Sequence, residues 1–146
     1  MDLRYTESDQ AFRIELRAFL ADAVPAHGAA PFRHDWDARR AYDTGWQRKL
    51  FDAGYAGINW PKEYGGQGRP AIEQFIFFDE VQRVGFPIPL LTLNTVGPTL
   101  MRFGTDEQKD FFLPRILRGE LHFSIGYTEP HAGTDLASLS TSAVAD

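Results

Sequence analysis

The amino-acid sequence predicts a mostly α-helical fold, a bundle of about five helices followed by the first strand and loop of an incomplete β region. Two patterns lead to this prediction. Apolar residues recur at helical spacing in five successive segments before residue 119. The period then shortens to two, which is typical of a strand. With 146 residues, 43 % of them hydrophobic, the chain is long enough to bury one core.

The first two helices have recognisable start and stop signals. We expect the first over residues 7–23, because a capping signal around Thr6 precedes its apolar face and Pro25 should end it. The second should run over residues 36–53 and end at Gly54, a residue that readily adopts positive φ.

The next three helices differ in how clearly they are marked. The segment 71–84 is apolar on most sides, which predicts a central helix that several others bury. The segment 90–103 is equally apolar, but Pro98 should break or kink its middle. The segment 105–118 opens with Thr105 in capping-box spacing.

The period changes after these helices. Leu121, Phe123, Ile125 and Tyr127 alternate with small or polar residues, which predicts a strand over 121–128. A single strand cannot form a stable sheet, so the β region is incomplete in this sequence.

Composition excludes several functional classes. The net charge is −5 and no basic stripe stands out, which argues against nucleic acid as a partner. No apolar run is long enough to span a bilayer, and the first ten residues lack the features of a signal peptide. There are no cysteines, which excludes disulfides and thiolate chemistry. We therefore expect a cytoplasmic protein with no membrane span.

Common catalytic and metal-binding patterns are not met. The four histidines lack metal-ligand spacing, so no metal site is predicted. His131, Thr134 and Asp135 lie within one turn, whereas catalytic triads are assembled from distant segments. The stretch YGGQG lacks the lysine and hydroxyl residue of a P-loop.

The stretch GYTEPHAGTDLAS, which begins at Gly126, does contain groups that could bind a ligand. Backbone N–H groups around Gly133 and Thr134, with the hydroxyls of Thr128 and Thr134, form a cluster of donors. Such a cluster suits an anion or a polarised ring edge. The same residues also suit an ordinary turn between two strands, and spacing alone favours the turn.

This stretch resembles the signature of the acyl-CoA dehydrogenase family, (A/G)-x-T-E-P-x-A-G-S-D, with Thr134 where serine is usual. The stretches GINWPKEYGGQG and FGTDEQKDFFLPRILRGE also resemble the family, and the likeness covers essentially the whole chain. It implies an all-α N-terminal domain over residues 1–119 and the start of a middle β domain over 120–146.

The resemblance implies an FAD-dependent enzyme that introduces a double bond between Cα and Cβ of an acyl-CoA substrate. It also implies electron-transfer flavoprotein or a similar acceptor as a partner, and a homo- or hetero-oligomer, commonly a tetramer. Tyr127 and Thr128 would offer N–H groups to the pyrimidine edge of the flavin, and Thr134 would also approach the substrate. The residues implied to bind FAD are Ile125, Gly126, Tyr127, Thr128, Gly133 and Thr134.

The resemblance leaves important points open. The family's catalytic carboxylate lies on a C-terminal helical domain that this sequence does not include, and the family uses Glu129 structurally, so no catalytic residue is named. We expect residues 1–146 to be inactive on their own. A non-catalytic helical subunit that pairs with a fuller dehydrogenase chain is the alternative, and a non-functional fragment is a third. The resemblance implies that the acyl chain lies against residues 91–99. It does not identify the acyl group, and it does not distinguish a dehydrogenase from a related oxidase.

Overall fold

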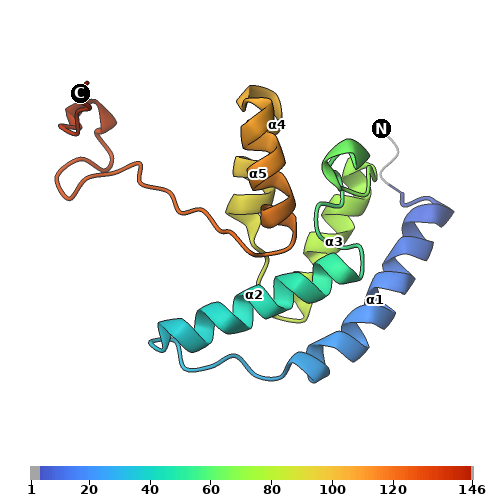
Figure 1. Ribbon diagram of the computed structural model, residues 1–146. Helices are drawn as coiled ribbons and strands as arrows, with labels where there is room; N and C mark the ends of the chain where they lie inside the picture. Colours follow the sequence, from blue (N-terminus) through green and yellow to red (C-terminus); the bar gives the residue numbers. More distant parts are fainter. Residues whose placement is uncertain (1–3, 146) are drawn as a thin grey trace.

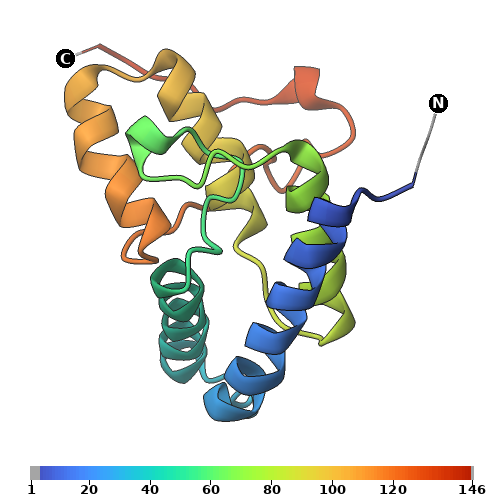
Figure 2. The same ribbon diagram turned by 90° about the vertical axis from the view of Figure 1, so that its right-hand side faces the viewer.

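The computed structural model describes residues 4–145 and confirms the mostly helical fold class. Figure 1 shows the helices in sequence colours, with α1 alongside α3 and α4 alongside α5; Figure 2 shows the same arrangement from the side. The α-helices are α1 (Glu7–His27), α2 (Trp36–Asp52), α3 (Ala71–Arg83), α4 (Gly97–Phe103) and α5 (Asp106–Leu117). Shorter elements are η1 (Lys62–Tyr64), the π-helical η2 (Thr92–Val96) and η3 (Leu136–Ser138).

Two hydrophobic clusters form the core. The first joins α1, α2 and α3 and has Leu16, Trp46 and Ile76 fully buried at its centre. The second surrounds Trp60 and includes the inner face of α5. Ion pairing adds to the contact between α1 and α3, because the buried carboxylate of Glu80 accepts two hydrogen bonds of 2.8 Å from the Arg17 guanidinium.

Helix α1 is longer than predicted. It continues through Pro25 to His27, whereas the sequence predicted an end near residue 23. A proline this close to the C-terminus costs only one helical hydrogen bond, and the last turn is held from outside. The His27 ring packs against Tyr42, with ring centroids 4.4 Å apart, and its Nε2 lies 2.9 Å from the Tyr42 carbonyl.

Helix α3 is buried on one face rather than on most sides. Ile76 and Val81 are fully buried, but Phe75 is 56 % exposed and Ile72 is 40 % exposed. The apolar pattern of α3 could not show which of its faces would be covered by other parts of the described chain.

The helix expected over residues 90–103 forms, and a π-turn accommodates Pro98. The Gly97 N–H donates to the Thr92 carbonyl five residues back, and Pro98 has no N–H to offer. This leaves the Leu93 carbonyl without its helical partner. The Trp60 indole N–H donates to that carbonyl at 2.8 Å, so the fully buried Trp60 satisfies it.

The strand predicted over 121–128 does not form in the part of the chain that the structure describes. These residues pair with no other segment, and the one β-bridge found in residues 4–145 joins Glu129 and Ala132. An alternating pattern marks a chain that can pair, but a strand also needs a neighbour to accept and donate its backbone hydrogen bonds.

Candidate functional site

The candidate site lies on the segment that follows α5. Gly119, with φ of +73°, ends the helix, and the chain then runs away from the helical body as an extended arm (Figure 1). All six residues that the sequence singled out for FAD lie on this arm. The structure therefore presents them together, beyond the helices rather than among them.

The first half of the predicted site is open to solvent. Tyr127 is 66 % exposed, Ile125 is 50 % exposed, and a Cβ on Gly126 would meet nothing within 4 Å. Within residues 4–145, the backbone N–H groups of Tyr127 and Thr128 and the Thr128 hydroxyl donate to no protein atom. Unpaired donors in a row are suited to an acceptor-rich ligand edge.

Glu129 folds the arm back on itself. Its carboxylate accepts hydrogen bonds from the backbone N–H of Ser140 at 3.0 Å, the Ser140 hydroxyl at 2.9 Å and the backbone N–H of Thr141 at 2.6 Å, with a further bond from the Thr141 hydroxyl. These donors favour the ionised form, so they lower the pKa of Glu129 to about 2, with the Thr141 hydroxyl contributing most. Glu129 thus holds the arm in shape, in agreement with the structural role that the resemblance implied.

A tight turn brings the second half of the predicted site, Gly133 and Thr134, next to the first half. The N–H and carbonyl groups of Glu129 and Ala132 exchange two hydrogen bonds of 3.1 Å, so Thr128 and Gly133 flank the same tight turn. Ala132 is buried at 1 % exposure and anchors the turn.

Gly133 has no positive φ, so the turn itself does not require glycine at this position. A Cβ on Gly133 would meet nothing within 4 Å of protein, which leaves the space beside it open for the close approach of a ligand. Thr134 is exposed, and its side chain is free of hydrogen bonds to the described residues.

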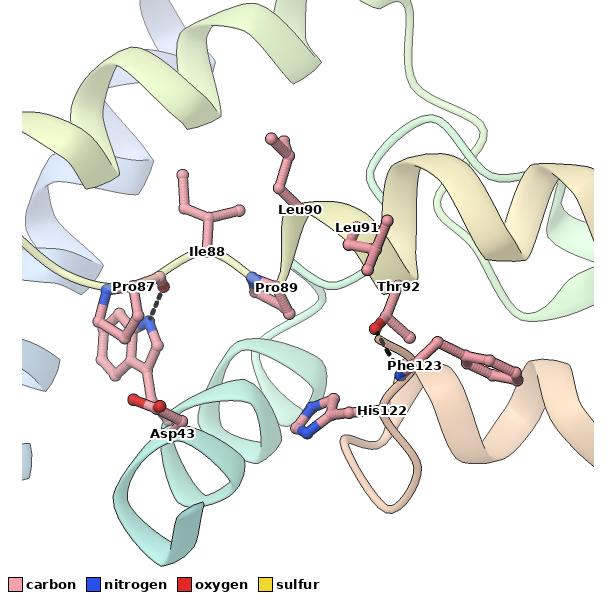
Figure 3. A pocket seen from close by; sticks show the side chains of 10 residues that line it. Asp43, Pro87, Ile88, Pro89, Leu90, Leu91, Thr92, His122 and Phe123 are labelled. Carbon is pink, nitrogen blue, oxygen red and sulfur yellow. Dashed lines mark hydrogen bonds between the residues drawn. The ribbon is translucent and has the colours of Figure 1, made fainter. Parts of the chain in front are cut away.

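A cavity of about 340 Å³ lies where the arm leaves the helices. Figure 3 shows its mainly apolar wall, formed by the segment Pro87–Leu91, and its polar side chains Asp43, Thr92 and His122. The segment 91–99, where the resemblance placed the acyl chain, therefore contributes to this wall only through Leu91 and Thr92.

Sequence reasoning missed the residues that join the cavity to the arm. The buried Gln47 side chain contacts His122 at 2.7 Å, and the Thr92 hydroxyl accepts a hydrogen bond of 3.1 Å from the Phe123 N–H. These partners are 75 and 31 residues apart in the chain, and no local pattern marks them. The only available signal was a polar residue, Gln47, on the apolar stripe of a helix.

The four histidines do not gather into a metal site. Among residues 4–145, no group of three or more His, Asp or Glu side chains is arranged to hold a metal ion. Nor is any helix in this range long and apolar enough to cross a lipid bilayer.

Comparison with known proteins identifies a matching family and several relatives of this chain. Residues 6–120 match the family described as acyl-CoA dehydrogenase, N-terminal domain. Acyl-CoA dehydrogenase FadE26 of Mycobacterium tuberculosis is 47 % identical over 149 residues, which cover 100 % of this chain and 37 % of the relative. Acyl-CoA dehydrogenase FadE29 of the same organism is 58 % identical over 99 residues, 68 % of this chain and 26 % of that protein.

Solved structures show the same fold. The crystal structure of the ChsE4-ChsE5 complex from M. tuberculosis superposes with a TM-score of 0.83 at 47 % identity, over 100 % of this chain and 37 % of that one. The protein described as the Tcur3481-Tcur3483 steroid ACAD superposes with a TM-score of 0.82 at 49 % identity, over 100 % of this chain and 38 % of that one. The chain thus spans little more than a third of the length of these relatives.

Proposed function

Because the chain belongs to the acyl-CoA dehydrogenase family, we propose that it forms the N-terminal part of an FAD-dependent enzyme that desaturates an acyl-CoA thioester between Cα and Cβ. Residues 1–119 would be its all-α N-terminal domain and residues 120–146 the start of its middle β domain. The end of α5 at Leu117 and the end of the family match at residue 120 support this boundary.

The unpaired donors on the arm carry the proposal. The N–H groups of Tyr127 and Thr128, with the Thr128 hydroxyl, would bind the pyrimidine edge of the flavin, where negative charge develops during reduction. The open space at Gly133 would admit the FAD pyrophosphate, and Thr134 would also face the substrate. Ile125 and Gly126 would complete the contact. The described residues therefore fit the cofactor.

The chemistry that FAD supplies when bound is acceptance of the hydride that leaves Cβ. This chain's own residues would hold and orient that group and stabilise its charge, while the cavity wall around Leu90–Thr92 would contact the acyl chain. No residue of this chain is assigned the α proton, and a carboxylate from beyond residue 146 would take it. Electrons would pass on to electron-transfer flavoprotein or a similar acceptor.

The relatives support a proposal for substrate and assembly. One solved relative is described as a steroid ACAD, and two are complexes of two different chains. We therefore extend the proposal to a steroid-derived acyl-CoA, to a hetero-oligomer of the tetrameric size usual in the family and, with no cysteines in the chain, to a cytoplasmic location.

Flavin content and dye reduction test the proposal. The complete polypeptide that contains residues 1–146, purified with its partner chain, should carry stoichiometric flavin absorbance and reduce an electron-acceptor dye only when an acyl-CoA is present. A matched sample limited to residues 1–146 should retain no FAD and reduce no dye, because these residues span only 37 % of the length of the relative FadE26. Lack of flavin in the complete protein would overturn the proposal, and flavin on residues 1–146 alone would overturn the need for further residues.

A second candidate function is favoured by the two-chain relatives. The chain would then be a non-catalytic helical subunit that assembles with a fuller dehydrogenase chain. It should co-purify in a stable complex with such a chain and leave that complex's flavin content unchanged when Thr128 is replaced by valine. A chain that runs alone on gel filtration excludes this role.

A further inference from the structure

The Thr92 side chain ties the extended arm to the cavity wall. Thr92 is 3 % exposed and begins the π-turn η2, so its backbone position is set by the packed helix. Its hydroxyl accepts a hydrogen bond of 3.1 Å from the Phe123 N–H, and Figure 3 shows this contact at the edge of the cavity. Thr92 therefore touches both the cavity and the arm.

Gln47 holds His122, the residue that precedes Phe123 on the arm. Its amide nitrogen donates to the carbonyl of Ile116 and, at 3.4 Å, to that of Leu117. Because carbonyls only accept, the amide nitrogen must face them, and the Gln47 oxygen is left to accept from Nε2 of His122 at 2.7 Å. Nε2 of His122 therefore carries a proton, and burial, which lowers the pKa of His122, favours its neutral form.

These contacts are the last side-chain hydrogen bonds from the helical body to the arm. Within the described residues, positions 124–128 bond to no helix, and Phe123 lies five residues before Thr128. An extended chain of that length reaches roughly 16 Å. The hydrogen bond at Phe123 is therefore the last fixed point on the arm before the donors of Tyr127 and Thr128.

We propose that Thr92 is a positioning residue that couples the cavity to the flavin-facing donors, while Gln47 holds the adjacent His122. A ligand that fills the cavity contacts Thr92 and restrains its hydroxyl, which in turn restrains Phe123 and the donors that follow. This inference rests on the proposed function, because it takes Tyr127 and Thr128 to face the flavin and the cavity to take the acyl chain.

The test uses the complete holoenzyme with three variants. Thr92→Val keeps the shape of the side chain but loses the acceptor, Thr92→Ser keeps the hydroxyl, and Thr44→Val is the matched control. The Thr44 hydroxyl donates to the Arg40 carbonyl at 2.8 Å within α2, and Thr44 does not line the cavity. If Thr92→Val does not fold, Thr92→Ala provides a smaller side chain without the hydroxyl.

We expect Thr92→Val to raise the Kd for FAD about three- to tenfold, the range that the loss of one intramolecular hydrogen bond produces. The variant should also speed hydrogen exchange at the Phe123 amide. A CoA thioester that fills the cavity should shift the visible flavin spectrum of the wild type, and this shift should shrink in Thr92→Val. Thr92→Ser and Thr44→Val should behave as wild type in all three measurements.

The outcomes separate this inference from the proposed function. A wild-type enzyme that binds FAD, together with a Thr92→Val variant of unchanged FAD affinity and an unchanged ligand-induced spectral shift, would show that Thr92 does not position the donors. Faster exchange alone, without a change at the flavin, would make Thr92 a purely structural residue and would also overturn the inference. A wild-type enzyme without FAD would instead refute the proposed function itself.

Discussion

Replacing Gly97 by alanine should destabilise the helical body through a single overpacked contact. A Cβ at this position would lie 2.0 Å from Cζ2 of Trp60 and 2.6 Å from Cη2, whereas ordinary contact begins at 3.4 Å. The ring or the helix must therefore move by at least 1.4 Å, the difference between 3.4 and 2.0 Å. The backbone itself is compatible with alanine, because φ and ψ are −55° and −57°. Only the contact with Trp60 opposes the change.

The magnitude follows from what that movement disrupts. Overpacking a well-filled core costs roughly 2 kcal/mol. A shift of this size also separates the Trp60 indole from the Leu93 carbonyl, now 2.8 Å apart, and a buried carbonyl left unpaired costs roughly 2 kcal/mol. The better helix propensity of alanine returns roughly 1 kcal/mol. We expect a net loss of about 3 kcal/mol in the free energy of unfolding, or about 10 °C in Tm for a domain of this size.

Thermal and urea unfolding followed by tryptophan fluorescence measure the effect, with Trp60 itself among the reporters. Gly126→Ala is the matched control, since a Cβ there meets nothing within 4 Å, and its Tm should stay unchanged. A double-mutant cycle with Trp60→Phe locates the cause, because the smaller ring should relieve much of the cost of Gly97→Ala. An equal cost in both backgrounds, or a Tm shift below about 2 °C, would refute the overpacking argument.

Two further predictions concern the arm. Thr128→Val in the complete enzyme should weaken flavin binding or shift the flavin reduction potential, because a donor is lost; unchanged affinity and potential would show that Thr128 does not face the ring. Glu129 has its pKa lowered from 4.5 to about 2 when the arm is folded, so the open arm binds more protons between these values. Its contribution to the folded arm is therefore complete above pH 4.5 and is lost as the pH falls towards 2. Hydrogen exchange at the Ser140 and Thr141 amides should be slow and level from pH 7 to 4.5 after correction for intrinsic rates. It should then accelerate towards pH 2, and Glu129→Gln should show fast exchange throughout; a protected Glu129→Gln arm would contradict this role.

Local chemistry explains why most of the helices were predictable. Thr6 and Thr105 each accept a hydrogen bond from the backbone three residues on, as their capping signals predicted, because a cap involves only neighbours in the chain. The end of α1 was placed too early because Pro25 was read without the contacts of His27 that hold the last turn. The prediction of a strand over 121–128 was wrong for the described residues. An alternating pattern gives a segment an apolar face, but it does not provide the neighbouring strand that must pair with it.

In the candidate site too, features set by neighbouring residues could be predicted, whereas those set by tertiary contacts could not. The residues from Ile125 to Thr134 could be singled out from sequence because they form one continuous motif, and their contact with FAD stays a prediction. The connection of the cavity to the arm depends on Gln47 and Thr92, whose partners lie 75 and 31 residues away. The starts of the helices, the start of the arm and its family signature could be predicted because each depends on residues that are neighbours in the chain. The partner of the Leu93 carbonyl in the π-turn and the direction in which the arm leaves the helices could not, because buried polar groups find partners wherever packing brings them together.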